Sequence, residues 1–260
     1  MSNYIAVDFE TTGLEPSEGA EIIEIGAARF TLDGGITERF SALCRPSKAI
    51  PPRATKVHGI RDADVVDCPS SAEVWRQFLA WAGEFDALVA HNAPFEMKFL
   101  LALHDGRGDD LPDLQFIDTL ELARRRIAEP PSYKLGDLAR HLGISQDGLH
   151  RAEADAVVVA QLLSAVAATY KNPGSSIKRS VLSLHAFREQ RLEEAQLVAR
   201  ANRVLDNMKR SSRQLEEINR TLDAMEEREV KPKDRTHAGV WVFVLALVGL
   251  LVFAVLSAGP

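Results

Sequence analysis

The chain has 260 residues, of which 46% are hydrophobic and 26% are charged, and this length accommodates one or two domains with buried cores. Residues 1–170 contain 16 Lys and Arg against 26 Asp and Glu, a net charge of −10, whereas residues 171–260 have a net charge of +4. This acidity excludes attraction of a polyanion by a general positive field, so nucleic-acid contact in the first region requires local basic groups or bridging divalent cations.

The stretch IAVDFETTGL (residues 5–14) predicts a first strand that contains two acids. Side chains alternate along a strand, so Asp8 and Glu10 project from the same face and their carboxylates are neighbours. Ionised carboxylates away from water are costly and repel each other, so a fold keeps them only beside protons, cationic side chains or metal ions. An edge strand with a wet polar face is the alternative that this tripeptide alone leaves open.

The rest of residues 1–170 alternates between strand and helix patterns, which is typical of an α/β domain. Alternating residues over 21–30 and 36–44, separated by the turn at 33–35, predict a three-stranded meander with the first strand. Short strands are expected over 87–90 and 115–117, and helices from Ser70 or Ser71, from Pro94, and over 119–126, 135–142 and 152–170.

A linker is predicted over 171–180, followed by a long helical stalk over 181–230. Apolar residues of the stalk recur every three or four positions, as in a coiled coil, although Arg191 and Glu194 interrupt this seam. A helix that packs intermittently on a partner or on the domain is therefore an open alternative. If the stalk pairs, the polar Asn219 at a core position favours a defined register and a parallel homodimer.

The last predicted element is a transmembrane helix over 238–258, because 240–256 is uncharged and a helix of about 20 apolar residues spans a bilayer. A buried C-terminal helix is the alternative. The basic juxtamembrane segment 231–237 is expected to stay on the cytoplasmic side. The predicted location is therefore membrane-anchored, with the catalytic domain in the cytoplasm.

Two further clusters place acids at strand ends and helix starts. Glu96 ends the stretch HNAPFE in the first turn of a helix, and in HRAEAD His150 precedes a helix that contains Asp155. Carboxylates from separate segments can converge only if divalent ions neutralise them, and oxygen ligands select Mg²⁺ or Mn²⁺. A pair of such ions suits in-line attack of water at phosphorus, so the sequence predicts a two-metal site.

Five segments in order resemble the DnaQ-like, or DEDDh, 3′-5′ exonuclease family, whose proofreading members are the epsilon subunits of bacterial replicative DNA polymerases. The segments are VDFETTGL, KVHGI, HNAPFE, FIDTLELAR and HRAEADA, and they lie between residues 3 and 168. The resemblance implies an RNase H-like exonuclease fold for residues 1–170.

The resemblance also implies that Asp8, Glu10 and Asp155 hold two metal ions and that His150 is the general base for the attacking water. Histidine suits this role because the residue type titrates near neutral pH. The departure from the family is Glu96, where Asp is usual: the charge is kept, but one extra methylene displaces a ligating oxygen. Glu96 is still expected to bind a metal directly or through water, and an impaired or inactive relative is the alternative.

By resemblance, the residues expected to contact the substrate near its terminal nucleotide are Thr11, Thr12, Leu14, His58 and Phe95. Leu and Phe side chains can pack on a base without reading its identity, although a plain core role fits Phe95 equally well. Asp118 also matches the family, but it is expected to cap the helix over 119–126.

The predicted function is a membrane-tethered 3′-5′ exonuclease that hydrolyses phosphodiester bonds at the 3′ end of single-stranded nucleic acid, with DNA favoured over short RNA. Two alternatives remain open: a module that binds nucleic-acid ends with a weakened site, and a membrane scaffold protein in which the nuclease fold is a relic. The expected partners are single-stranded 3′ ends and the membrane, and no polymerase partner is identified.

Overall fold

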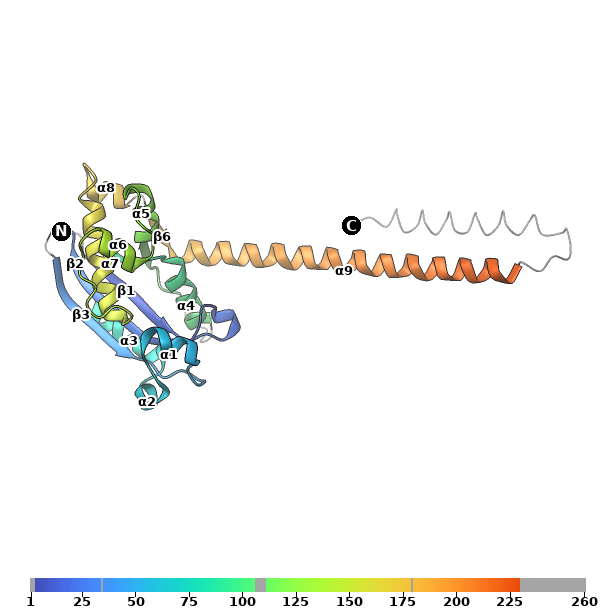
Figure 1. Ribbon diagram of the computed structural model, residues 1–260, viewed down its shortest axis with the longest axis horizontal. Helices are drawn as coiled ribbons and strands as arrows, with labels where there is room; N and C mark the ends of the chain where they lie inside the picture. Colours follow the sequence, from blue (N-terminus) through green and yellow to red (C-terminus); the bar gives the residue numbers. More distant parts are fainter. Residues whose placement is uncertain (1–2, 34, 106–110, 179, 230–260) are drawn as a thin grey trace. The chain divides into compact units, whose positions relative to one another are not determined.

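A computed structural model of the protein describes residues 3–33, 35–105, 111–178 and 180–229 (Figure 1). The chain divides into two compact units, residues 1–194 and residues 195–260, and each unit is described by itself. The domain boundaries expected from the sequence stay predictions.

A mixed sheet forms the centre of the first unit, with its strands in the order β3-β2-β1-β4-β5-β6. The strands are β1 (Tyr4–Thr11), β2 (Ile22–Thr31), β3 (Gly35–Leu43), β4 (Ala87–Ala90), β5 (Gln115–Asp118) and β6 (Val181–Ser183). As predicted, β1, β2 and β3 form an antiparallel meander, whereas β4 runs parallel to β1 and to β5, and β6 runs antiparallel to β5. Because β1 lies between β2 and β4, the edge-strand alternative for the first strand is wrong.

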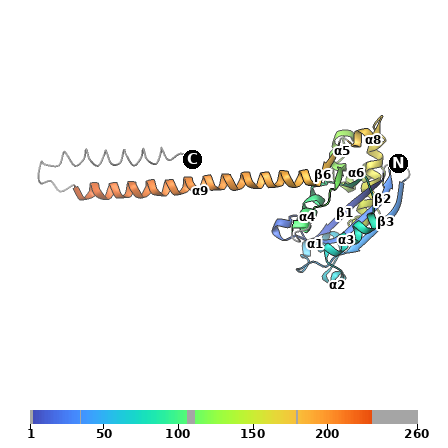
Figure 2. The ribbon, with the colours of Figure 1, turned by 180° about the vertical axis from the view of Figure 1, so that it is seen from behind.

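Helices cover both faces of this sheet, as Figures 1 and 2 show from opposite sides. The helical elements of the described residues are the 3₁₀ turn η1 (Pro16–Glu18), α1 (Pro52–His58), α2 (Asp62–Val65), α3 (Ser71–Ala82), α4 (Pro94–Asp105), α5 (Thr119–Arg126), α6 (Leu135–His141), α7 (Ala152–Ala167), α8 (Pro173–Lys178) and α9 (Leu184–Glu229). Local sequence fixes several starts: Ser70 caps α3 by accepting a hydrogen bond from the backbone N–H of Glu73, and Asp118 caps α5 through the N–H of Leu120. The predicted capping role of Asp118 is therefore confirmed.

Successive side chains of β1 point to opposite faces of the sheet. Val7 and Phe9 are buried against α3 and α4 on one face, whereas Ala6 is buried on the other face with residues of α5, α6 and α7. Because side chains alternate, Asp8 and Glu10 continue the second face. The two acids of the central strand therefore point toward the face that α7 covers.

The segment predicted as a linker, 171–180, contains α8, and β6 follows it as an edge strand. The predicted stalk corresponds to α9. Several apolar side chains of α9 are between 51% and 69% exposed: Leu197, Val198, Leu205, Met208 and Leu215. Pairing of this helix in a coiled coil stays a prediction.

The prediction of a transmembrane helix is corrected by the structure. Through Glu229, the helices of the described part of the chain include none that is both long enough and apolar enough to cross a membrane. The longest, α9, carries charged side chains along its length, whereas a spanning helix requires about 20 predominantly apolar residues. The segments 231–237 and 238–258 lie outside the described residues. The membrane anchor and the location inferred from it are therefore not retained.

Candidate active site

Three carboxylates from two distant segments meet on the α7 face of the sheet. Asp8 and Glu10 come from β1, and Asp155 comes from the first turn of α7. Each residue offers a carboxylate oxygen, and these atoms all lie within 4.8 Å of one another. The structure thus brings together residues that are 145 positions apart in the sequence, in an arrangement that can hold a metal ion.

The electrostatics of this cluster favour a bound cation. Burial, followed by the charges of Glu96, Asp155 and Glu10, raises the pKa of Asp8 well above its usual value. Burial also raises the pKa of Glu10 to about 8 and the pKa of Asp155 to about 6. Without a cation the cluster retains protons at neutral pH, so a divalent ion that replaces them fits the residues present.

Glu96 lies beside this cluster but outside the set of three. It occupies the first turn of α4, is only 3% exposed, and its Oε2 has no hydrogen-bond partner among the described residues. Burial is the main cause that raises its pKa, and the charge of Asp118 adds to it. A buried carboxylate oxygen without a partner is costly, so this atom is suited to a metal ion or to a proton.

His150 occupies the turn immediately before α7. Its backbone is left-handed, with φ at 71°, and its N–H donates to Asp155 Oδ1 at 3.3 Å. The side chain is exposed. The turn therefore ties His150 to a carboxylate of the cluster while leaving the imidazole accessible to solvent and substrate.

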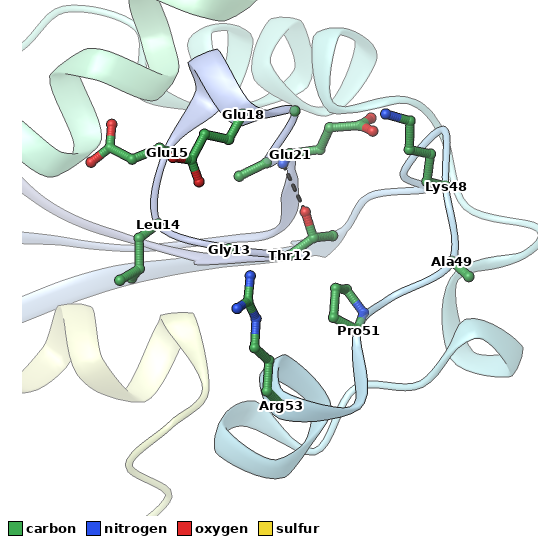
Figure 3. A pocket seen from close by; sticks show the side chains of 12 residues that line it. Thr12, Gly13, Leu14, Glu15, Glu18, Glu21, Lys48, Ala49, Pro51 and Arg53 are labelled. Atoms are coloured by element: carbon green, nitrogen blue, oxygen red, sulfur yellow. Dashed lines mark hydrogen bonds between the residues drawn. The ribbon is translucent and has the colours of Figure 1, made fainter.

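Three of the predicted substrate contacts, Thr11, Thr12 and Leu14, lie at the end of β1 and in the loop that follows it. Thr11 Oγ1 donates to Gly13 O at 2.7 Å, and Thr12 Oγ1 accepts from Glu21 N at 2.9 Å, the bond dashed in Figure 3. These bonds fix the loop, whereas Leu14 is 74% exposed. Thr12 and Leu14 line a pocket of about 210 Å³ whose other residues include Arg53, which Figure 3 shows directed toward Gly13.

The other two predicted contacts are more enclosed. His58, at the end of α1, is 5% exposed; its Nδ1 accepts from Ile60 N at 3.0 Å, and its Nε2 has no partner in the described part of the chain. Burial lowers the pKa of His58, which favours the neutral ring. Phe95 is half-buried on α4, with its ring centroid 5.0 Å from that of Phe99. Contact of either residue with a nucleotide stays a prediction.

A second buried glutamate, which was not predicted from the sequence, stabilises the site. Glu24 on β2 is fully buried and lies opposite Glu10 in the strand register. Its carboxylate accepts from Arg151 Nη2 at 2.7 Å and Nε at 3.1 Å, and from Ala152 N at 3.1 Å. The Glu24–Arg151 clamp therefore fixes the start of α7, directly between His150 and Asp155.

Gly26, two residues further along β2, makes this close approach of α7 feasible. A Cβ atom at this position would lie 2.0 Å from the backbone carbon of Ala152, so only glycine fits. The signal for the Glu24–Arg151 clamp was present in the sequence, since Glu24 is an acid within the otherwise uncharged run 22–28 of β2. The same physical reasoning that singled out Asp8 and Glu10 applies to it.

Comparisons with known proteins agree with this geometry. A family model described as an exonuclease matches residues 5–163. A DNA polymerase III subunit epsilon-like protein of Rhodobacter capsulatus is 36% identical over 185 residues, which cover 69% of this chain and 26% of that protein. The 3′-5′ exonuclease DinG of Bacillus subtilis is 36% identical over 156 residues, which cover 60% of this chain and 16% of that protein. The chain thus spans about a quarter or less of the length of these two relatives.

Solved structures share the fold. Exonuclease X, solved in complex with 5′-overhanging duplex DNA, is similar with a TM-score of 0.52 at 28% identity, over 64% of this chain and 92% of that chain. The nuclease domain of 3′hExo, a DEDDh family member bound to rAMP, has a TM-score of 0.57 at 20% identity, over 63% of this chain and 90% of that chain, and shows the fold alone. The RNase H-like α/β prediction is therefore confirmed. By its matched region and its fold, the chain belongs to the exonuclease family, among the DnaQ-like 3′-5′ exonucleases.

Proposed function

We propose that the protein removes nucleotides from the 3′ end of single-stranded nucleic acid, with DNA as the preferred polymer and nucleoside monophosphates as products. The observation that carries the proposal is the convergence of the Asp8, Glu10 and Asp155 carboxylates within 4.8 Å on the α7 face of β1. Membership of the exonuclease family supports hydrolysis of phosphodiester bonds as the reaction.

Asp8, Glu10, Asp155 and Glu96 are proposed to hold a pair of divalent ions, Mg²⁺ or Mn²⁺. The raised pKa values of these acids and the unpartnered Oε2 of Glu96 support this, because each feature is relieved by a cation. When bound, such ions lower the pKa of the attacking water and stabilise the leaving oxygen. Oxygen-only ligands favour these ions over zinc.

His150 is proposed to accept the proton of the attacking water. Its exposed imidazole and the bond of its N–H to Asp155 support this role, because the base must be accessible and held close to the carboxylate cluster. The clamp between Glu24 and Arg151 fixes the adjacent residue, so it holds the turn that carries His150. Thr12 and Leu14 are proposed to contact the terminal nucleotide, and the pocket that both residues line supports this role.

The preference for DNA is supported by exonuclease X, which was solved with duplex DNA that has a 5′ overhang. Short RNA remains the second polymer to be tested. The apolar side chain of Leu14 can pack on any base, which suits binding of single strands without sequence readout.

The proposal is tested with end-labelled DNA and RNA oligonucleotides of matched sequence. We expect shortening from the 3′ end with Mg²⁺ or Mn²⁺, none in EDTA, and loss to background in Asp8→Ala. Asp67→Ala, which removes an exposed acid outside the carboxylate cluster, is the matched control and should retain full activity. Activity that persists in Asp8→Ala or in EDTA contradicts the proposal.

A module that binds nucleic-acid ends without cutting them is the second candidate, favoured by one observation, the glutamate at position 96 where the family usually has aspartate. In that case labelled oligonucleotides bind to the protein in the presence of Mg²⁺ and remain uncut. The same assay, read by binding and by product length, separates the two candidates.

A further inference from the structure

A pocket of about 340 Å³ lies between the first turns of α4 and the first turns of α9. It is lined from α4 and the loop before it by Asn92, Phe95 and Lys98, and from α9 by Phe187, Gln190 and Arg191. All of these residues belong to the first compact unit of the chain. The α9 wall lies outside residues 5–163, the region that the exonuclease family model matches.

The α9 wall is held in place by the sheet. β6 pairs with the edge strand β5, and Leu184 is fully buried with its N–H donating to Leu114 O at 3.0 Å. Phe187, one turn further, is half-buried against the core residues that α4 also contacts. Phe187 and Arg191 are therefore presented at a fixed position opposite Phe95.

The lining combines aromatic rings with charged side chains of both signs, Lys98 and Arg191 with Glu15 and Glu194. The carboxylate of Glu194 accepts a hydrogen bond from Gln190 Nε2 at 2.9 Å. Phe95 and Phe187 are both half-buried, and the Nζ of Lys98 lies 4.8 Å from the ring centroid of Phe95. Lys98 forms an ion pair with Glu15 at 2.7 Å, which neutralises the acid on this wall. Arg191 is exposed and makes no ion pair with an acid in the described ranges. Its guanidinium is therefore available to an anion from outside the protein.

This chemistry suits a nucleotide, because rings accept the flat face of any base and a guanidinium binds phosphate. One wall of the pocket comes from the first turn of α4, the turn that also carries Glu96. The first 170 residues have a net charge of −10, so binding of a polyanion beside them requires local cations, and Arg191 of α9 supplies one.

We propose that the α4–α9 pocket binds a nucleotide of the substrate strand on the 5′ side of the scissile bond, with its base against Phe187 and Phe95 and its phosphate at Arg191. This inference rests on the proposed function. A 3′-5′ exonuclease takes the terminal nucleotide into its reaction centre, so every other nucleotide of the same strand lies on the 5′ side of the bond that is cut. Residues at the start of α9 are therefore expected to raise the affinity for substrate strands that are long enough to reach the pocket.

The test compares Arg191→Gln with Arg200→Gln in the full chain. Both arginines are exposed on α9, but Arg200 does not line the pocket. With a single-stranded oligonucleotide of about ten nucleotides, we expect KM to rise about tenfold in Arg191→Gln with kcat changed less than twofold, as for loss of one charge-assisted contact. The slope of log KM against log salt should fall by about 0.7, the value for one phosphate contact of a single strand.

Two further measurements make the result specific to the pocket. Hydrolysis of the single-nucleotide substrate thymidine 5′-(p-nitrophenyl phosphate) should be unaffected by Arg191→Gln, because it has no upstream nucleotide. Phe187→Leu keeps an apolar side chain at this position of α9 but removes the ring. It should raise KM for the oligonucleotide and not for the single-nucleotide substrate, with the melting temperature unchanged.

Equal KM values and equal salt slopes for Arg191→Gln and Arg200→Gln would overturn the inference. If the wild-type chain cuts no oligonucleotide, the proposed function fails, and the pocket is then judged by fluorescence anisotropy of a labelled oligonucleotide in EDTA. Weaker binding by Arg191→Gln than by Arg200→Gln supports the pocket in that case, and equal binding rejects it.

Discussion

Two buried glutamates near the central strand β1 differ in whether the protein supplies hydrogen-bond partners for their carboxylates. Glu24 on β2 is 0% exposed, and its carboxylate accepts hydrogen bonds from the Arg151 guanidinium and from the backbone of Ala152. Glu96 on α4 is 3% exposed, and its Oε2 has no hydrogen-bond partner among the described residues. The sequence presents both simply as acids next to apolar residues.

The difference teaches how to separate a structural acid from a functional one. A buried carboxylate that the protein satisfies with a bidentate arginine and a backbone N–H contributes to the fold. A buried carboxylate left without a partner costs free energy unless a proton or a metal ion binds to it. Glu24 therefore fixes α7, whereas Glu96 is available to a cation that the protein itself does not supply.

The largest expected effect comes from Arg151→Gln, which removes the guanidinium that binds the buried carboxylate of Glu24. This change leaves Glu24 buried without its cation, and should lower the free energy of unfolding by about 2–3 kcal/mol, less than for a fully buried pair because Arg151 is half-exposed. The start of α7 should also shift, with a loss of nuclease activity of about a hundredfold. Chemical denaturation and the oligonucleotide assay measure the two effects.

Arg39→Gln is the matched control for this prediction. Arg39 pairs with Glu153 at 3.4 Å in the same first turn of α7, but on the exposed side. Its loss should change the free energy of unfolding by less than about 0.5 kcal/mol and leave activity intact. Equal effects of the two substitutions would show that the Glu24–Arg151 clamp stabilises the start of α7 no more than the exposed Arg39–Glu153 pair does.

An intermediate effect is expected from pH on the metal-free protein. The pKa of Glu10 is about 8 and that of Asp155 is about 6, above their unfolded values of about 4, so the folded state retains protons that the unfolded chain has released. This stability is fully present below about pH 4 and is lost as pH rises through 6 and 8. The melting temperature in EDTA should therefore fall by several degrees between pH 5 and pH 9.

Two comparisons sharpen the pH prediction. Added Mg²⁺ should remove most of the fall, because the cation replaces the protons. Glu10→Gln should flatten the upper part of the curve, since the side chain that titrates near pH 8 is gone. A wild-type melting temperature in EDTA that rises over this range, or a Glu10→Gln curve that matches the wild type, would show that these carboxylates are not held together as the structure places them.

The smallest expected effect comes from Glu96→Asp, at the buried carboxylate whose Oε2 has no hydrogen-bond partner among the described residues. Shortening this side chain restores the residue that the family usually has, so we expect activity to be kept or to rise by up to about fivefold. Glu96→Gln, which keeps the length and removes the charge, is the control and should lose activity. A large loss in Glu96→Asp, measured with Mg²⁺ on a labelled oligonucleotide, contradicts this prediction, whereas full activity in Glu96→Gln counts against a role for this carboxylate in holding the metal.

Much of the fold was predictable because its signals are local. Ser70 as a cap, Pro94 as a helix start and the alternation over 21–30 each act within a few residues, and the corresponding elements form close to the expected bounds. β6 (Val181–Ser183) was missed, and its residues were assigned to the start of the helical stalk. Three residues are too few for a periodic pattern, and this strand exists only because it pairs with the edge of β5.

The sequence by itself predicted that Asp8, Glu10 and Asp155 converge, because acids in apolar strands and helices require compensation wherever the chain takes them, and the structure brings the three carboxylates within 4.8 Å of one another. Only the tertiary structure decided which cation serves which acid. Arg151 and Glu24 are 127 positions apart, and they meet because Gly26 lets α7 pack directly on β2. The α9 wall opposite Phe95 was likewise set by packing on the sheet, since contacts between distant segments depend on the whole fold and leave no local pattern.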